Sequence, residues 1–408
     1  MPRAKTMPSA QSPAMQHLTL GHLSRVVPPA TIEDVLTQQG KHNAYRCKLP
    51  AMLLVYFIIG LGLQRAQPYR EVLRWLLDGL KPLWGAARLP AKMAGKAAIS
   101  MARTALGWPV LQAVFAACAQ PLATAATRGA WFAGRRLVAL DGTAFATPDT
   151  ASNTAAFGKS GSKHGASAFP LARVLVLVEL GTHAVFGAAI GSWRSGETTL
   201  ARRLLPRLGP GMLLLADRIF FSRALWDAAC ATGADLLWRV KADLDLPVEQ
   251  ALPDGSYLST VYRTRGACRR GVGGRRVRVI TYALPGVPHA DACYRLVTTL
   301  LDPDAATAQD VAALYHERWE VEGVLDEVKT HLRGGNALLL RSLTGDGVRQ
   351  EIYGLLLAHY TVRTVMHDAA LQSGEDPDRL SFVHTVRVLR RQLSQGAALP
   401  PSAVATLV

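Results

Sequence analysis

The sequence predicts an α/β protein that carries an all-α region at its N-terminal end. Up to about residue 128 the apolar residues recur at helical spacing, with Gly and Pro in the gaps. Short apolar runs typical of buried strands begin near residue 135, and helical segments separate them as far as about residue 241. The chain has 408 residues, 49% of them apolar, so it can bury a large core and is long enough for two or three domains.

Residues 1–23 are rich in Pro, Ser and Gln, which is typical of a flexible tail, and residues 24–128 form the predicted helical domain. Helices are expected at 32–38, 52–63, 69–77, 96–106 and 109–117. The segment 96–106 carries Ser100, Arg103 and Thr104 among small residues. That composition is compatible with a DNA-binding helix, although ordinary helix packing produces the same pattern.

The strand region, 129–241, has a definite order of elements. Strands are expected at 136–146, 173–179, 183–190, 212–216 and 235–241, and helices at 196–205 and 222–232, the second beginning at a Ser222 cap. Three strands, a helix, a strand, a helix and a strand is the order of a ribonuclease-H-like fold. In that fold the first and fourth strands lie side by side in a mixed sheet flanked by helices.

The remaining segments complete this core. Residues 242–300 contain many Gly and Pro turn signals and short alternating strands such as 276–282, so they are predicted to be a mostly β insertion subdomain. Residues 301–370 are expected to supply the second part of the core, with helices at 307–332 and 348–366. Residues 371–408 are predicted to be a basic helical region containing an amphipathic helix at 382–393.

Three carboxylates stand out within this scheme. Asp141 and Asp217 each end an apolar strand, whereas a lone Asp in such a place is usually a turn residue. Glu322 lies on the helix 307–332, where Tyr315, Arg318, Glu322 and Lys329 follow one another at helical steps and share one stripe. The apolar stripe of that helix lies beside it, while Glu320 and Glu327 point away from it.

This Y-R-E-K spacing, together with the two strand-ending aspartates, resembles the insertion sequence four family of DDE transposases along most of the chain. The resemblance implies a ribonuclease-H-like catalytic core whose catalytic residues are Asp141, Asp217 and Glu322. Three gathered carboxylates repel one another unless a cation neutralises them, and all-oxygen ligands favour Mg²⁺, with Mn²⁺ as a substitute. The hypothesis is a pair of ions that Asp141 bridges, with Asp217 and Glu322 each holding one.

The charge of the chain favours a DNA partner. Lys and Arg total 46 against 30 Asp and Glu, a net charge of +16, and the pI is near 10. Seven arginines and no acid lie between Arg263 and Arg278, which indicates a phosphate-contacting ribbon or, alternatively, a solvated basic hairpin.

Several other side chains are candidate DNA contacts. The resemblance implies that Tyr315, Arg318 and Lys329 contact phosphates of the terminal DNA, although Tyr315 could instead pack against the sheet. The further candidates are Arg218, Arg239, Lys241, Lys159 and Lys163. The glycine-rich loop that holds the last two fails the Walker pattern, and a mobile solvent loop is the alternative there. Relatives that use a DNA hairpin hold a flipped base with Trp, and Tyr294 stands at the corresponding place.

The predicted function is therefore a transposase that binds terminal inverted repeats, cleaves DNA with metal and joins the 3′ ends to target DNA. A homodimer is expected in the paired-end complex. Two alternatives remain open: a ribonuclease-H-like nuclease without strand transfer, and a non-catalytic DNA-binding regulator of transposition. Five cysteines without metal-site spacing fit a reducing, cytoplasmic location. The longest apolar run, 49–63, is too short to cross a membrane comfortably, so no membrane partner is expected.

Overall fold

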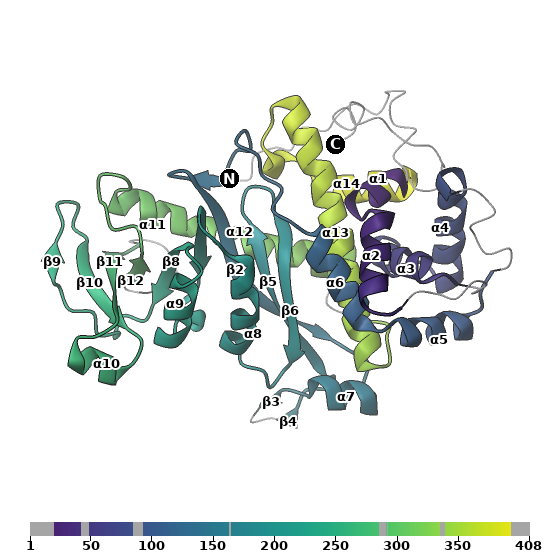
Figure 1. Cartoon of the computed structure of the whole chain (residues 1–408), viewed down its shortest axis with the longest axis horizontal. Helices are drawn as coiled ribbons and strands as arrows, with labels where there is room; N and C mark the ends of the chain where they lie inside the picture. Colours follow the sequence, from purple (N-terminus) through teal and green to yellow (C-terminus); the bar gives the residue numbers. More distant parts are fainter. Residues whose placement is uncertain are drawn as a thin grey trace.

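A computed structural model describes residues 20–41, 49–84, 93–162, 165–284, 291, 293–334 and 339–392 of the protein. The molecule is elongated, with a bundle of helices at one end, a β-rich region at the other and a twisted sheet between them (Figure 1). Most of the predicted tail and the end of the predicted C-terminal region, residues 393–408, fall outside the described residues.

One mixed sheet forms the centre of the fold. Its strand order is β6-β5-β2-β7-β8-β12-β11-β10-β9, and β1 (Trp131–Phe132) pairs with β2 in addition. The first five strands are β2 (Arg135–Ala146), β5 (Leu171–Glu179), β6 (Ala184–Ser192), β7 (Met212–Ala216) and β8 (Asp235–Val240). Their order and their parallel β2–β7 and β7–β8 pairs confirm the predicted ribonuclease-H-like arrangement.

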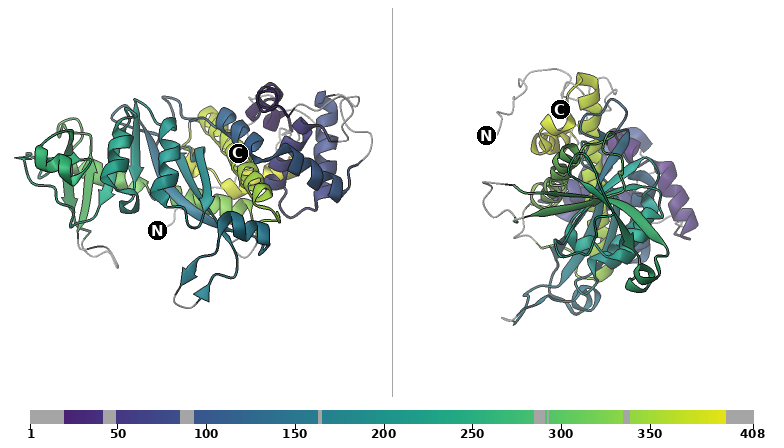
Figure 2. Two further views of the ribbon diagram at one scale, coloured as in Figure 1. Left: turned by 60° about the horizontal axis from the view of Figure 1, so that its bottom comes forward. Right: turned by 90° about the vertical axis from the view of Figure 1, so that its left-hand side faces the viewer.

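Alternation along each strand sends side chains into two separate cores. In β2, Leu137 and Ala139 face the core under the long helix α13 (Gly345–Ser373), while Val138 and Leu140 face the core under two short helices. These short helices are α8 (Glu197–Leu204) and α9 (Arg223–Cys230), the latter capped by Ser222 as predicted. Both faces of the sheet are therefore covered, and Figure 2 shows its twist along the long axis.

The predicted insertion continues this sheet instead of forming a separate one. Strands β12 (Tyr294–Thr298), β11 (Gly274–Tyr282), β10 (Tyr257–Tyr262) and β9 (Gln250–Ala251) extend the edge beyond β8. Within it, Thr264 caps an unpredicted short helix, α10 (Arg265–Arg270), which ends at Gly271 in the left-handed conformation. The arginine cluster is thus part helix and part strand.

Arg278 of that cluster does not contact solvent, which corrects its place in the predicted phosphate-contacting ribbon. Its side chain is 0% exposed, pairs with Asp254 and donates to Ser256 Oγ at 2.8 Å and to the Ala306 carbonyl at 2.6 Å. A guanidinium buried this deeply is stable because its donors are satisfied. Arg278 therefore joins the insertion to the loop before the next helix.

The helix predicted over 307–332 is interrupted. It consists of α11 (Ala308–Glu317), a tight turn at Arg318 and Trp319, α12 (Glu320–Asp326) and a π-helical segment, η5 (Glu327–Leu332). Around the turn, backbone N–H groups bond to the carbonyl three residues back, as in a 3₁₀ helix. The prediction of one continuous α-helix was therefore wrong, and the stripe of four residues is interrupted between Arg318 and Glu322 and again before Lys329.

The N-terminal helices pack around α13 and share its core. Their bounds are α1 (Leu20–Val26), α2 (Pro29–Gln38), α3 (Ala51–Leu63), α4 (Tyr69–Trp84), α5 (Lys96–Leu106) and α6 (Trp108–Cys118). Arg103 of α5 is buried and donates to Gln350, Ser342 and the Gly347 carbonyl, each at 3.0 Å, so it is a packing residue and not the DNA contact considered from the sequence. Among the described helices, α3 included, none has both the length and the hydropathy of a membrane span.

Helices α3 and α13 cross closely because glycines stand at the crossing. A Cβ atom on Gly354 would lie 2.7 Å from the Ile58 carbonyl oxygen, and one on Gly62 would lie 2.9 Å from the Ala358 Cβ. Contacts this short force one helix away from the other. The crossing holds the helical end of the molecule against the sheet.

We expect Gly354→Ala to lower the free energy of unfolding by about 1–3 kcal/mol, because the added methyl overpacks the α3–α13 crossing. Denaturant unfolding measures the change. Gly323→Ala is the matched control, since a Cβ there meets no atom within 4 Å and a helical Ala is about 0.5–1 kcal/mol more favourable than Gly. Equal stabilities for the two variants would contradict this account of the crossing.

Candidate active site

The parallel pairing of β2 with β7 places two predicted acids side by side. Leu140 pairs with Ala216 in this register, so the next residue on each strand is an aspartate, Asp141 and Asp217. Side chains alternate between the two faces along a strand, and the positions of both aspartates put their side chains on the α12 face of the sheet. Each carboxylate accepts a hydrogen bond from the following backbone amide, Gly142 N–H at 2.7 Å and Arg218 N–H at 2.6 Å.

Glu322 approaches the same point from α12, and Arg318 lies between it and the sheet. The Arg318 guanidinium is 4.0 Å from Asp141 Oδ2 and 3.8 Å from Glu322 Oε1. Burial raises the pKa of Asp141, the charges of Glu322 and Asp217 raise it further, and the Gly142 amide and Arg318 lower it. The three predicted catalytic acids are therefore close enough to influence one another.

These acids fit a divalent metal ion by their chemistry. All the donors are carboxylate oxygens, which hard cations such as Mg²⁺ prefer. Asp141 and Asp217 each use Oδ1 to accept a backbone hydrogen bond, which leaves Oδ2 available. Arg318 supplies only part of the neutralising charge, because its distances to the acids exceed hydrogen-bond range.

A second group of possible ligands, His183, Glu320 and Asp378, lies elsewhere and fits a metal poorly. His183 Nε2 is 3.2 Å from Glu320 and 3.1 Å from Asp378, while Arg363 Nη2 donates to Nδ1 at 2.5 Å. An arginine can only donate, so the ring proton lies on Nε2 between the acids. A metal would have to replace that proton, and the group is better explained as an internal hydrogen-bond network.

Tyr315 and Lys329, the other members of the predicted stripe, are placed differently from each other. Tyr315 is 3% exposed, its ring centroid is 5.8 Å from the Arg318 guanidinium, and its hydroxyl has no hydrogen-bond partner among the described residues. Burial raises its pKa. Lys329 lies on η5, where burial and Arg333 lower its pKa and Asp326 raises it. None of the three acids is among the charges that shift it.

Arg218 and Arg239 converge on one carboxylate that the sequence did not indicate. Arg218 Nη1 lies 2.9 Å from Asp291 Oδ2, and Arg239 contacts the same oxygen. Asp291 precedes β12 in the sequence, and nothing in its sequence context distinguishes it from an ordinary surface acid. Two arginines that share one oxygen form an arrangement that also suits a phosphate oxygen.

Tyr294 stands between two neighbouring strands. Its ring stacks on Tyr282 of β11 at 5.2 Å and 18°, and the Arg239 guanidinium of β8 lies 4.3 Å from its centroid. Since β11 and β8 flank β12 on opposite sides, both faces of the ring are covered. A flipped base can stack on Tyr294 only after one of these neighbours moves.

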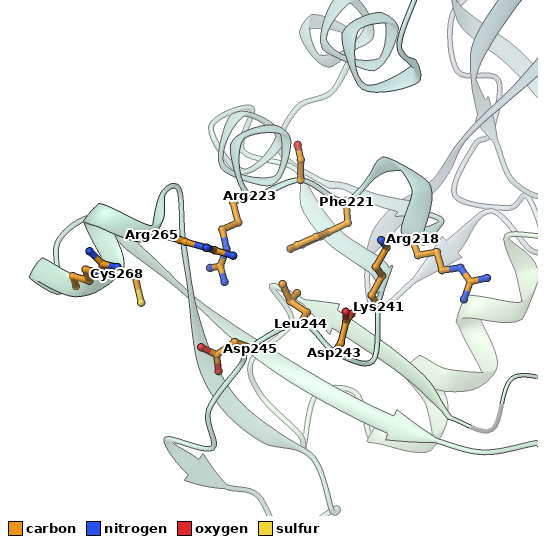
Figure 3. A pocket seen from close by; sticks show the side chains of 11 residues that line it. Arg218, Phe221, Arg223, Lys241, Asp243, Leu244, Asp245, Arg265 and Cys268 are labelled. Atoms are coloured by element: carbon orange, nitrogen blue, oxygen red, sulfur yellow. The ribbon is translucent and has the colours of Figure 1, made fainter.

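The other predicted contacts lie farther from the acids in the fold. Lys159 forms an ion pair with Asp149 at 2.7 Å near the hairpin of β3 (Gly161–Ser162) and β4 (Gly165–Ala166), and Lys163 is outside the described residues. Lys241 is exposed just after β8 and lines a cavity with Arg218 (Figure 3). Trp319 was not predicted, although it is 55% exposed and lies 4.9 Å from the Arg318 guanidinium.

We expect Asp141→Asn to stabilise the metal-free protein at neutral pH. Folding raises the pKa of Asp141, so the wild-type protein loses stability as the pH rises through that pKa and the carboxyl group ionises. The Asn side chain does not ionise, so the variant does not lose this stability. Thermal unfolding in EDTA at several pH values measures the effect. The stability advantage of Asp141→Asn over wild type should shrink as the solution is acidified, and a pH-independent difference would contradict the electrostatic cause.

The chain matches known proteins over most of its length. Residues 132–360 match the family described as "Transposase DDE domain", and residues 17–116 match "Insertion element 4 transposase N-terminal". The transposase InsG for insertion sequence element IS4 of Escherichia coli (strain K12) is 28% identical over 93% of this chain and 84% of its own length. The putative transposase InsZ of the same organism is 25% identical over 53% of this chain and 69% of its own length. The chain therefore belongs to the DDE transposases of the insertion element 4 family.

Proposed function

We propose that this transposase binds the terminal inverted repeats of its element, cleaves the DNA strands there and joins the freed 3′-hydroxyl ends to target DNA. The observation that carries the proposal is the β2–β7 register, which sets Asp141 beside Asp217 on the face that Glu322 approaches. Retention of three mutually repelling acids at one point costs stability, and metal-dependent catalysis explains why they are kept together.

Divalent metal dependence is a property of DDE transposases, and we propose Mg²⁺ as the ion, with Mn²⁺ able to replace it. Asp141 would bridge two ions, and Asp217 and Glu322 would each hold one. When bound, the ions would activate the attacking oxygen and stabilise the leaving oxygen of an in-line displacement at phosphorus. The protein's part is to fix the three carboxylates and to exclude other ligands.

The cations around the acids would position the DNA. Arg318 is held against Asp141 and Glu322, so a phosphate placed there meets a preoriented guanidinium. The Tyr315 hydroxyl would gain a hydrogen-bond partner, which it lacks among the described residues, and Lys329, about two helical turns after Glu322, would contact the DNA backbone farther along. On the sheet side, Arg218 and Arg239 would exchange the Asp291 carboxylate for a phosphate.

The N-terminal helices would recognise the inverted repeats. The exposed face of α5 contains Lys96, Ser100 and Thr104, which suit backbone and base-edge contacts even though Arg103 is buried. Two copies would act together in a paired-end complex, each bound to one end of the element. Gel filtration of the DNA complex, compared with the free protein, tests this pairing.

Glu322→Gln should abolish cleavage and joining of a labelled DNA end taken from the element's flanks, with a loss of about 10²-fold or more, because a metal-holding carboxylate is removed. Products are resolved on a denaturing gel in Mg²⁺, Mn²⁺ or EDTA. DNA affinity should change little, because Glu322 is half-exposed and its removal takes away a negative charge near DNA.

Glu375→Gln is the matched control, since that acid is exposed and pairs only with Arg379 at 3.2 Å among the described residues. Metal-dependent cleavage without any joined product would identify a nuclease instead. DNA binding with no cleavage under any metal condition would identify a regulator. Cleavage that survives in Glu322→Gln would remove Glu322 from the active site.

Metal binding should also be visible without DNA. We expect Mn²⁺ or Mg²⁺ at about 100 times its dissociation constant to stabilise the wild-type chain by about 2.7 kcal/mol, and EDTA to reverse the change. Asp141→Asn should lose this stabilisation, because it removes the proposed bridging carboxylate. The His183→Gln variant should keep the metal-induced stabilisation. Loss of that stabilisation in His183→Gln would place the metal at the group formed by His183, Glu320 and Asp378.

A further inference from the structure

A cavity of about 620 Å³ lies between α9, the turn after β8 and α10 (Figure 3). Eleven residues line it: Arg218, Phe221, Ser222, Arg223, Lys241, Asp243, Leu244, Asp245, Arg265, Cys268 and Arg269. Its volume is in the range of small-ligand sites. The residues come from the core and the insertion alike.

Three of the five cations that line this cavity are not engaged by the described protein, while Arg218 pairs with Asp291. Lys241, Arg265 and Arg269 form no ion pair or side-chain hydrogen bond within the described part of the chain, and Arg223 only donates to the Tyr262 carbonyl at 3.3 Å. By contrast, Arg263 and Arg275 of the same cluster pair with Asp227. Lys241, Arg265 and Arg269 are therefore free to bind an anion.

The acids of the cavity are also free. Asp243 and Asp245 form no ion pair or side-chain hydrogen bond with any described residue, although five cations line the same space. A ligand that is only anionic would meet repulsion from these two carboxylates. A ligand that carries both an anionic group and N–H donors would satisfy both kinds of side chain.

An aromatic ring forms part of the wall. Phe221 packs against Trp226 at 6.0 Å and 49°, and edge-on against Trp238 at 6.4 Å and 86°. These contacts fix the ring from the core side, while the ring points into the cavity beside Leu244 (Figure 3). A fixed aromatic ring next to free arginines is the usual composition of a site for an unpaired nucleotide.

One lining residue connects the cavity with the proposed catalytic acids. Arg218, which lines it, directly follows Asp217 and donates its backbone N–H to that carboxylate. Trp226 and Trp238, which hold Phe221, belong to the core under α8 and α9, on the face of the sheet opposite α12. The cavity therefore lies on the opposite face of the sheet from the acids, and Arg218 is the lining residue that adjoins Asp217.

We propose that this cavity binds one unpaired nucleotide, with its phosphate on Arg265 and Arg269, its base stacked on Phe221 and the amino edge of the base donating to Asp243 or Asp245. The proposal rests on the proposed function in one respect, the source of the nucleotide, which we assign to a DNA strand leaving the active site. A free nucleotide has the same chemistry, and the experiment separates the two sources.

The test compares binding of a blunt DNA duplex with binding of the same duplex carrying a four-nucleotide single-stranded extension, measured by fluorescence anisotropy with Glu322→Gln as the background. We expect the single-stranded extension to raise the affinity for the duplex. Phe221→Leu should lower the affinity for the extended duplex by about fivefold or more, because base–aromatic stacking is lost, and should leave the affinity for the blunt duplex unchanged. Phe169→Leu, at a ring 40% exposed on a loop, is the matched control.

Charge variants test the phosphate contacts. Arg265→Gln with Arg269→Gln should lower the affinity for the extended duplex more than for the blunt one, and should reduce its salt slope by about 1–2. The control pair is Arg74→Gln with Arg379→Gln, two exposed arginines on other elements. The proposal would be overturned if the double variant lost equal affinity for the extended and the blunt duplex. It would also be overturned if the Glu322→Gln background protein bound both duplexes equally well.

Cys268 provides a readout that needs no inverted repeat and no catalysis. It is exposed and lines the cavity, whereas Cys293 is exposed outside it. A short single-stranded oligonucleotide should slow alkylation of Cys268 by iodoacetamide by about threefold or more when it fills the site, and leave Cys293 unchanged, as followed by peptide mass spectrometry.

A deoxynucleoside 5′-monophosphate is the second arm. Protection of Cys268 by the oligonucleotide alone supports a DNA strand as the source, and equal protection by the mononucleotide supports a free nucleotide in the same site. Absence of protection by either overturns the site. A failure of cleavage and joining in wild type, with protection intact, would refute the proposed function and leave the nucleotide site standing.

Discussion

The structure depends on one electrostatically unfavourable contact, the juxtaposition of Asp141 and Asp217 at the parallel β2–β7 pair. The sheet enforces this contact, because shifting the register by one residue would turn the buried side chains of β2 to the opposite face. The apolar residues on both faces of β2 and β7 therefore hold the acids in place. Glu322 adds a third charge, and Arg318 is the only cation within 4.0 Å of two of them among the described residues. The candidate active site is thus a point of mutual charge repulsion that a large apolar sheet holds together.

Arginine serves two distinct purposes around this sheet. Arg103, Arg278 and Arg363 are buried, and each donates to several acceptors that lie far apart in the sequence. Such residues join the helical end and the insertion to the core, so their guanidinium groups are not available to contact a phosphate. Arg265, Arg269 and Lys241 are exposed without partners in the described structure and remain available for such contacts. The total of 46 Lys and Arg therefore overstates the number of cations available to a phosphate backbone.

The sequence was most informative where a periodic apolar pattern decides the structure. The strands around Asp141 and Asp217 and the Ser222 cap were predicted nearly to the residue, because burial and capping are local properties. The roles of Arg103 and Arg278 could not be predicted, since their partners, such as Gln350 and Asp254, lie beside them only in the folded chain. The interruption at Arg318 has no Gly or Pro to mark it. It follows from tertiary contacts, which draw the guanidinium toward the sheet and leave Trp319 outside.

The arrangement around Tyr294 connects the proposed DNA contacts of Arg218 and Arg239 with the proposed base-stacking residue. Asp291 holds Arg239, and Arg239 covers one face of the Tyr294 ring while Tyr282 covers the other. Arg239 Nε is buried without a partner in the described structure, so the guanidinium is incompletely satisfied where it stands. If a phosphate takes the place of Asp291 on Arg218 and Arg239, as we propose, Arg239 can move and uncover one face of the Tyr294 ring. A base can stack on Tyr294 only after Arg239 or Tyr282 moves, and in the proposed complex binding of the DNA backbone supplies the first of these movements.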